Sequence, residues 1–447
     1  MVKTLITAWK IPELRKKIIY TIFILFLFRL GCAVPVPFIN ILTENAIGGN
    51  DPNTFLGFLS MLNGEAFMYG RLFALGITPY INASIILQLL AVAIPALEKL
   101  SHDEEGRKKM ATITRYVTIG LAVLQGVAYY IYIWSQGNML VTDANGQAFT
   151  GGMVWVVGLF VVAALTAGSA LTMWLGEQIN DKGIGNGISL ILFAGIVSRI
   201  PSILTQLVTI AFQKEGWYYL ASFIGLVSLI LMLAYIVWMD NAERRIPVQY
   251  AKRVVGRKMY GGQSSNIPIK VNMSGVLPVI FASSILSLPP TIEMFVQNKL
   301  NADTPSGKFW TGFFSLFHAE HWVYGIIYFV LIIFFAYFYA SIQYNPVEMA
   351  NNLSKNNGMI PGIRSGRPTA DYIAKVINKI VLLGALMLSV VALYPILFTQ
   401  ITAAVKLEGM SLSIGGTSII ILVGVALETV QQIESQMMIR HYKGFLD

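Results

Sequence analysis

The chain consists of long apolar runs separated by short polar segments. A hydrocarbon core about 30 Å thick is crossed by a helix of about 20 mostly apolar residues. Ten runs meet this requirement, at about residues 18–37, 73–97, 113–134, 153–175, 184–205, 217–239, 273–295, 322–342, 376–398 and 413–433. The pattern predicts an all-α polytopic membrane protein with ten transmembrane helices.

Composition and charge agree with this prediction and add an orientation. Of the 447 residues, 55% are hydrophobic and 12% charged, about half the charged share of soluble domains. The net charge of +9 is distributed unevenly along the chain. Of the 32 Lys and Arg residues, 25 lie in the two termini and every second loop, and 6 lie in the opposite loops. By the positive-inside rule, both termini are expected to be cytoplasmic.

One segment of the chain matches another. "GITPYINASIILQL" (76–89) aligns without gaps to "GVLPVIFASSILSL" (275–288), with 8 of 14 positions identical. Chance similarity between two apolar strings is the alternative, but the aligned Gly and Pro disfavour it. The matched segments belong to the second and seventh predicted helices, so the repeated unit is five helices. Because five is odd, the second copy enters the membrane from the other side, which predicts an inverted repeat.

Polar residues follow one face of the second predicted helix. At 100° per residue, Ile77, Ile81, Ser84 and Gln88 fall within an arc of about 60°. These polar residues could simply join packed helices. The functional alternative is a wall that lines a path, wet at one end and closed by a dry constriction at the other.

The fifth predicted helix opens with a comparable arrangement. Glycines at 183, 185 and 187 permit close backbone approach at its entrance. Ile188 and Leu192 then lie one turn apart on one face.

Two kinds of segment between the predicted helices are unusual. Residues 53–71 are apolar but too short to span, so they form either an interfacial amphipathic helix or a short re-entrant helix that covers something. Residues 241–272 and 345–372 are long and basic, beyond what topology alone requires. Such surfaces suit an acidic or RNA-containing partner.

The sequence lacks the residues that several classes of membrane protein need for their function. No predicted span carries a catalytic pair or a carboxylate near its middle, so neither an intramembrane enzyme nor an ion-coupled transporter is favoured. No phosphate-binding Gly/Lys loop is present, and the single cysteine, Cys32, excludes a cysteine metal site. We expect no cofactor and no metal. A passive, gated pathway, driven by a partner, remains.

The sequence resembles the SecY family, the channel subunits of the bacterial protein-conducting translocon, over essentially its whole length. The resemblance is carried by "FALGITPYINASIILQLL", "WLGEQINDKGIGNGISLILFAGI", "RRIPVQYAKR", "SSNIPIKVNMSGVLPVIFASSIL", "NPVEMANNL" and "IPGIRSGRPT". It implies a clamshell of two five-helix halves, residues 1–210 with helices 1–5 and residues 211–447 with helices 6–10. It also implies a multi-pass protein of the bacterial plasma membrane.

The resemblance further implies roles for individual residues, all of them expectations at this stage. A ring of branched apolar residues that closes the pore corresponds to Ile77, Ile81, Ile188, Leu192, Ile280 and Ile421. A plug lies at about 53–71, with Phe55, Leu56, Phe58, Leu59, Met61 and Leu62. Polar residues expected at the lateral gate, where helices 2 and 3 meet helices 7 and 8, are Asn82, Gln125 and Ser287.

Two basic loops, at about 240–272 and 343–375, are expected to dock the SecA motor or a translating ribosome. Their candidate contact residues are Arg244, Arg245, Arg253, Arg257 and Arg364. Ser365 stands where many relatives have Pro, which leaves the stiffness of that turn open.

SecE and SecG are the implied partner subunits. Unfolded secretory polypeptides with a signal sequence are the implied cargo, and membrane lipid receives their apolar segments. The competing interpretation is a secondary transporter for a small solute, supported only by the inverted repeat.

Overall fold

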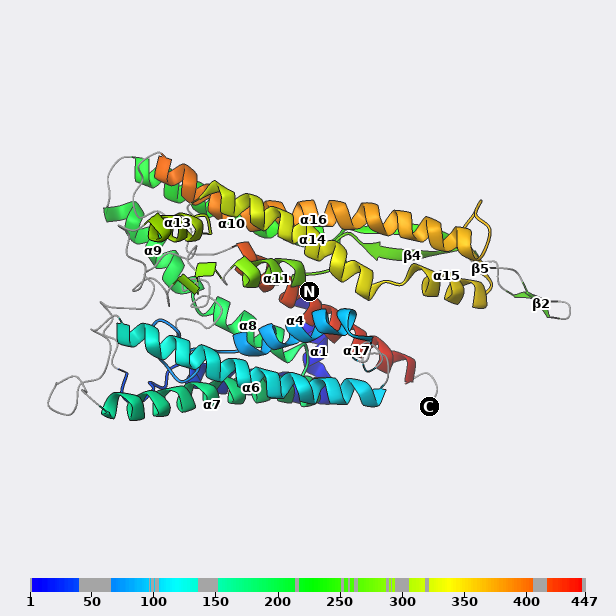
Figure 1. Cartoon of the computed structure of the whole chain (residues 1–447). Helices are drawn as coiled ribbons and strands as arrows, with labels where there is room; N and C mark the ends of the chain where they lie inside the picture. The colour runs from blue at the N-terminus through cyan, green and yellow to red at the C-terminus, as the bar shows by residue number, and fades with distance from the viewer. Residues whose placement is uncertain are drawn as a thin grey trace. The chain divides into compact units, whose positions relative to one another are not determined.

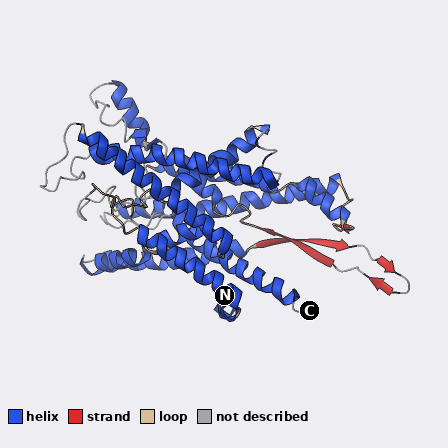
Figure 2. Cartoon of the chain, turned by 90° about the horizontal axis from the view of Figure 1, so that it is seen from below, coloured by secondary structure: helices blue, strands red, loops and turns tan. Residues whose placement is uncertain are grey.

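The computed structural model describes residues 2–39, 66–95, 97, 100, 104–135, 152–213, 217–250, 253–255, 258–260, 264–286, 289–290, 292–293, 305–317, 321–404 and 416–443. These residues are mostly helical (Figure 2). The helices are α1 (Val2–Lys10), α2 (Pro12–Gly31), α4 (Thr78–Ala93), α6 (Glu104–Ser135), α7 (Met153–Lys182), α8 (Gly187–Val197), α9 (Ile200–Gln213), α10 (Trp217–Asn241), α11 (Leu277–Leu286), α13 (Pro305–Ser315), α14 (Trp322–Gln343), α15 (Pro346–Lys355), α16 (Arg367–Ala404) and α17 (Gly416–Lys443). The strands are β1 (Glu243–Tyr250), β2 (Arg253–Val255), β3 (Lys258–Tyr260), β4 (Ser264–Lys270) and β5 (Gly358–Met359).

Within the described residues, 6 helices are long and apolar enough to cross a membrane. They are Glu105–Ile131, Met153–Lys182, Ser222–Asn241, Trp322–Lys355, Arg367–Phe398 and Gly416–Met438. Three shorter apolar helices, Thr78–Ala93, Gly187–Ser202 and Leu277–Leu286, coincide with the second, fifth and seventh predicted spans. The polytopic helical class is confirmed, and the count of ten stays a prediction.

Several helix boundaries differ from the apolar runs. Helix α2 begins at Pro12 rather than at residue 18, because a proline at the first helical position starts a helix well and the following lysines do not stop it. Helices α6 and α16 also extend into charged sequence. Hydropathy marks where a helix is apolar, whereas hydrogen bonding decides where it ends.

The chain forms two compact units. The first comprises residues 1–226, 286–324 and 395–447, and the second comprises residues 227–285 and 325–394. In the first unit, α7 packs against α2, α6 and α8, and α6 also packs against α4 (Figure 1). Helix α17 packs against α8 and α1. The expected division at residue 210 stays a prediction.

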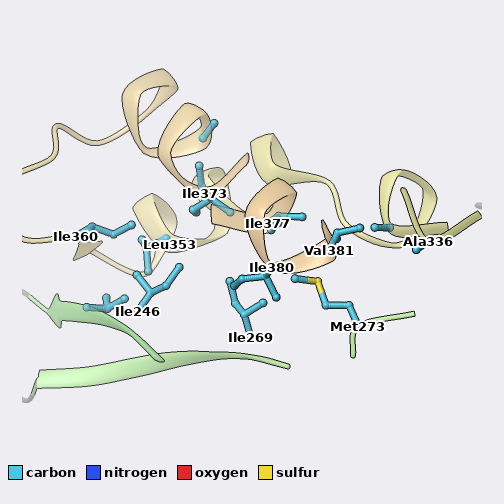
Figure 3. Packing of buried hydrophobic residues seen from close by; sticks show 14 of the residues in the cluster. Ile246, Ile269, Met273, Ala336, Leu353, Ile360, Ile373, Ile377, Ile380 and Val381 are labelled. Carbon is cyan, nitrogen blue, oxygen red and sulfur yellow. The ribbon is translucent and has the colours of Figure 1, made fainter. Parts of the chain in front are cut away.

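In the second unit, a small sheet covers the ends of helices α15 and α16. The strand order is β4-β1-β5, and both pairings are antiparallel. Ile246, Val248 and Ile269 from the sheet are buried against Leu353 of α15 and against Ile373 and Ile377 of α16 (Figure 3). A face with alternating buried residues explains why this basic segment, expected as a loop, forms strands.

The repeated segments share backbone geometry as well as sequence. Gly76 and Gly275 both adopt a left-handed conformation, with φ of 51° and 60°, which glycine tolerates without a Cβ penalty. Each is followed after one residue by a helix with Pro at its second position. In both, the next turn begins alike, since Ile81 N donates to Ile77 O at 3.1 Å and Ile280 N donates to Val276 O at 3.2 Å.

Candidate functional site

Helix α4 starts from a buried, non-helical segment, residues 66–77. Its main-chain groups find partners inside the protein: the Tyr129 hydroxyl donates to Phe67 O at 2.7 Å, and the Ser169 hydroxyl donates to Gly76 O at 3.1 Å. Non-helical backbone within a membrane protein is stable only when it is satisfied in this way. The segment fixes Ile77, the N-cap of α4, which is 1% exposed.

Two of the predicted ring residues meet over a glycine of α7. A methyl group placed on Gly176 would lie 3.6 Å from Ile77 Cδ1 and 3.5 Å from Ile188 Cγ1. Ile191 Cδ1 would lie 3.4 Å away. Side chains from α4 and α8 therefore converge on the same short stretch of α7.

The entrance of α8 depends on close backbone approach, as the glycines there predict. A Cβ on Gly187 would collide with the carbonyl oxygen of Gly176. The Gly187 N–H donates to Asn180 Oδ1 at 2.7 Å, and Asn186 caps the helix by accepting from the Ile188 N–H at 3.2 Å. Ile188 therefore lies on the first turn of α8, where the backbone of α8 packs directly against the backbone of α7.

The remaining predicted ring residues are apolar and shielded to different degrees. Leu192 is 4% exposed and Ile421 is 2% exposed, and their helices α8 and α17 pack together. Ile81, on the turn after Ile77, is half-buried. Ile280 is half-buried in α11, which belongs to the second unit.

The polar face of α4 lies as its periodicity predicts. The Gln88 amide donates to Ser84 Oγ at 3.2 Å, and exposure increases from half-buried Ser84 to exposed Gln88. Asn82 on α4 and Gln125 on α6 are half-buried on two helices that pack together. Ser287 lies outside the described residues, so of the three gate candidates the structure describes two.

The predicted plug side chains, Phe55 to Leu62, lie outside the described residues. The end of the predicted segment, residues 66–71, is described and is largely buried. Arg71 donates to Cys32 O at 3.3 Å, and its guanidinium lies 5.2 Å from the centre of the Tyr69 ring. This end is therefore anchored beside the end of α2.

The two basic loops belong to one structure. Strand β5 of the second loop pairs with β1 of the first, with Gln249 opposite Met359 and Tyr250 opposite Gly358. Their apolar residues share one core cluster, which includes Ile246 and Ile360. The sequence does not indicate this joining, which brings Arg244 and Arg245 of the first loop and Arg364 of the second onto one scaffold.

The predicted docking arginines differ in their surroundings. Arg244 and Arg364 are exposed. Arg245 pairs with Glu243, with 2.6 Å between Nη2 and Oε1, so part of its charge is neutralised. Arg253 lies on β2, and Arg257 lies outside the described residues.

The turn that carries Arg364 is shaped by two glycines and by a hydrogen bond to its main chain. Gly362 and Gly366, on either side, adopt left-handed conformations with φ of 82° and 96°. The hydroxyl of buried Thr369 donates to Arg364 O at 2.8 Å. How stiff this turn is with Ser365 in place of proline stays open.

Two polar pairs were missed by the sequence interpretation. Asn272 Nδ2 donates to Asp240 Oδ1 at 2.7 Å and closes the base of the β1–β4 ribbon. Arg115 of α6 pairs with Glu177 of α7 at 2.7 Å. Asp240 directly follows one predicted span and Asn272 directly precedes the next. Their matching places at the span ends could have indicated the pair from sequence. Among the described residues, no group of acidic, His or Cys side chains is arranged to hold a metal ion.

Comparisons with known proteins agree with one another. The SecY family model matches residues 71–430. The protein translocase subunit SecY of Streptomyces griseus is 43% identical over 444 residues, covering 98% of each chain. A solved structure of a protein-conducting channel has a TM-score of 0.61 at 17% identity, covering 95% of this chain and 92% of the other. A second, of a SecY channel whose plug domain stabilises the closed state, has a TM-score of 0.59 at 17% identity with the same coverage.

Proposed function

Because the chain belongs to the SecY family, we infer that it is the channel subunit of a protein translocase. It passes unfolded secretory polypeptides across the membrane and releases transmembrane segments sideways into lipid. The family comparisons support this function and give no support to the solute transporter.

We propose that the aliphatic residues around Gly176 form part of the closed waist of the pore. The observation that carries this proposal is the convergence of Ile77 and Ile188, from two helices, on one glycine of a third. Aliphatic side chains offer an ion nothing to replace its hydration shell, so a ring of them resists ion flow. The same flexible side chains can move apart around an extended polypeptide. Ile81, Leu192, Ile280 and Ile421 are proposed to complete the ring.

The other sites are proposed by position. Residues 53–71 would form the plug, anchored at the end near Arg71. Asn82, Gln125 and Ser287 would lie at the lateral gate, where a weakly polar seam keeps two states close in free energy.

The scaffold shared by the two basic loops would dock the partner that drives transport. We propose SecA or a translating ribosome there, on the cytoplasmic side of a bacterial plasma membrane with both termini also cytoplasmic. SecE and SecG would complete the complex. The chain itself would have no enzymatic activity, since the driving energy comes from the partner.

The test of the ring is ion conductance in reconstituted vesicles. Replacing Ile81 and Ile280 together with Gly should raise the leak, because two side chains are removed from the waist. Ile86 and Ile285 provide a matched control: they occupy aligned positions of the repeat, and they are 41% and 39% exposed. Ile86→Gly with Ile285→Gly carries the same helix cost and should leave conductance unchanged. The proposed ring would be contradicted if both double variants raised the ion leak equally, or if neither raised it.

A cross-linking experiment tests the path itself. A photo-reactive residue at position 81 or 280 should cross-link to an arrested secretory chain, whereas one at 86 or 285 should not. Cross-links at all four positions, or at none, would place the path elsewhere.

A further inference from the structure

Helix α13 has one aromatic face and one polar face. At 100° per residue, Phe309, Trp310, Phe313 and Phe314 fall within an arc of about 140°. Lys308, Thr311 and Ser315 lie on the opposite side. The sequence interpretation did not use this segment, which connects α11 to α14.

The aromatic residues form a continuous cluster. The rings of Trp310 and Phe314 stack with centroids 5.9 Å apart, and Phe313 lies edge-on to both, at 6.0 Å from Trp310 and 5.7 Å from Phe314. Phe314 is only 4% exposed and attaches the helix to the protein. Phe309 is 67% exposed, Trp310 45% and Phe313 39%. With about 200 Å² of surface per aromatic residue, these three leave roughly 300 Å² of ring surface uncovered.

The polar face needs no partner. The Thr311 hydroxyl donates to Lys308 O at 3.1 Å, and the Ser315 hydroxyl donates to Gly312 O at 2.8 Å. Lys308, the single charged residue of α13, is exposed. This side of the helix is suited to water.

The start of α14, shortly after α13, limits what can cover the aromatic face of α13. Helix α14, long and apolar enough to span the membrane, begins at Trp322, which is 69% exposed. Exposed tryptophan at the end of a spanning helix marks the membrane–water interface. Six residues, 316–321, lie between the end of α13 and Trp322, so the seven Cα–Cα steps from Ser315 to Trp322 span at most about 25 Å. Along the chain, α13 precedes the end of α14 that begins at Trp322, and the other end of α14 leads to α15.

We propose that α13 is an interfacial helix whose aromatic face is inserted into the headgroup region of the lipid bilayer. Tryptophan favours this region because its indole combines an apolar body with a polar N–H, and phenylalanine rings on the same face bury apolar surface at the boundary with the acyl chains. With one lysine on its polar face, α13 binds by its aromatic surface and not by attraction to anionic lipid. It anchors the connection between α11 and α14 to the membrane surface.

The experiment uses spin labels in the full chain, assembled with its partner subunits in phosphatidylcholine vesicles. Cys32, the single cysteine, is first replaced with Ser. A labelled cysteine is then introduced at Phe309 in one variant and at Thr311 in another. Both positions are exposed, so a label at either should leave the fold intact, which size-exclusion elution of each variant checks.

The expected result is opposite accessibility at the two positions. The label at 309 should collide several-fold more with oxygen, which dissolves in lipid, than with a water-soluble nickel chelate, and the label at 311 should show the reverse. High nickel accessibility at both positions would show a helix standing in water. Low accessibility to both reagents at 309 would show a protein cover. Either outcome would overturn the proposal, as would a strong change when anionic phosphatidylglycerol is added to the vesicles.

Discussion

The replacement Gly187→Ala tests whether the close approach of α8 to α7 positions Ile188. The added methyl group would overlap the carbonyl oxygen of Gly176, which is main chain and cannot rotate away. Overpacking a well-packed interior costs about 1–3 kcal/mol. Because the obstacle is backbone, we expect a loss near the upper end, about 3 kcal/mol.

Two other glycines provide matched controls. At Gly176 an added methyl group meets only side-chain atoms, at 3.4 to 3.6 Å, which is ordinary contact. At Gly120 in α6 it meets nothing within 4 Å. We expect Gly176→Ala to remain within about 1 kcal/mol of the wild type. Gly120→Ala should gain about 0.5–1 kcal/mol, because alanine is the better helix former.

The assay is unfolding of the purified protein by sodium dodecyl sulfate in mixed micelles, followed by tryptophan fluorescence. Vesicle conductance is a second measurement, since a displaced α8 should also raise the ion leak. If the Gly187→Ala variant had the same unfolding stability and the same vesicle conductance as Gly120→Ala, the close approach of α8 to α7 would not position the residues of the waist.

Three further predictions follow from particular contacts. Replacing Asp240 with Ala should lower the free energy of unfolding by about 1.5–3 kcal/mol, because its charged hydrogen bond with buried Asn272 is lost. A double-mutant cycle that combines Asp240→Ala with Asn272→Ala should give a coupling energy well above zero. The control cycle, Asp240→Ala with exposed Asn266→Ala, should give no coupling energy. Arg364→Glu should block motor-driven secretion into vesicles without lowering the amount of assembled complex, since the Arg364 side chain is exposed and the turn is held through the Arg364 carbonyl, which accepts from the Thr369 hydroxyl. Normal secretion would remove this turn from the docking surface. Cys32, at 3% exposure, should react with a maleimide at least tenfold more slowly in the folded protein than after unfolding, and equal rates would show that the end of α2 is open.

The polytopic helical class could be predicted because the bilayer constrains the length and composition of a spanning helix. The repeated start of α4 and α11 could also be predicted, since a left-handed glycine and a following proline act within a few residues. These signals are local, so one sequence carries them completely. The glycine at 187 was predicted to allow close approach for the same reason.

Contacts between distant residues were not predictable in this way. Asp240 and Asn272 are 32 positions apart, and their hydrogen bond forms only because β1 and β4 pair between them. The pairing of β1 with β5 brings together residues more than 100 positions apart, such as Gln249 and Met359. Ile246 and Val248 lie two positions apart, with Arg245 before them and Gln249 after them, but Pro247 between them and the basic charge of the segment favoured a loop.

Strand β4 determines how a partner can bind to the sheet. Among the described residues it is one of the two outer strands of the sheet, with β5 at the other edge, and an outer strand normally presents free main-chain groups to which another chain can add a strand. Pro268 removes one main-chain donor from β4, and exposed Lys270 adds a charge at its end. Strand addition at the β4 edge is therefore disfavoured, which favours recognition through exposed side chains such as Arg244. Binding of this kind weakens as ionic strength rises, so the proposed complex of this sheet with a driving partner should weaken when salt alone is added.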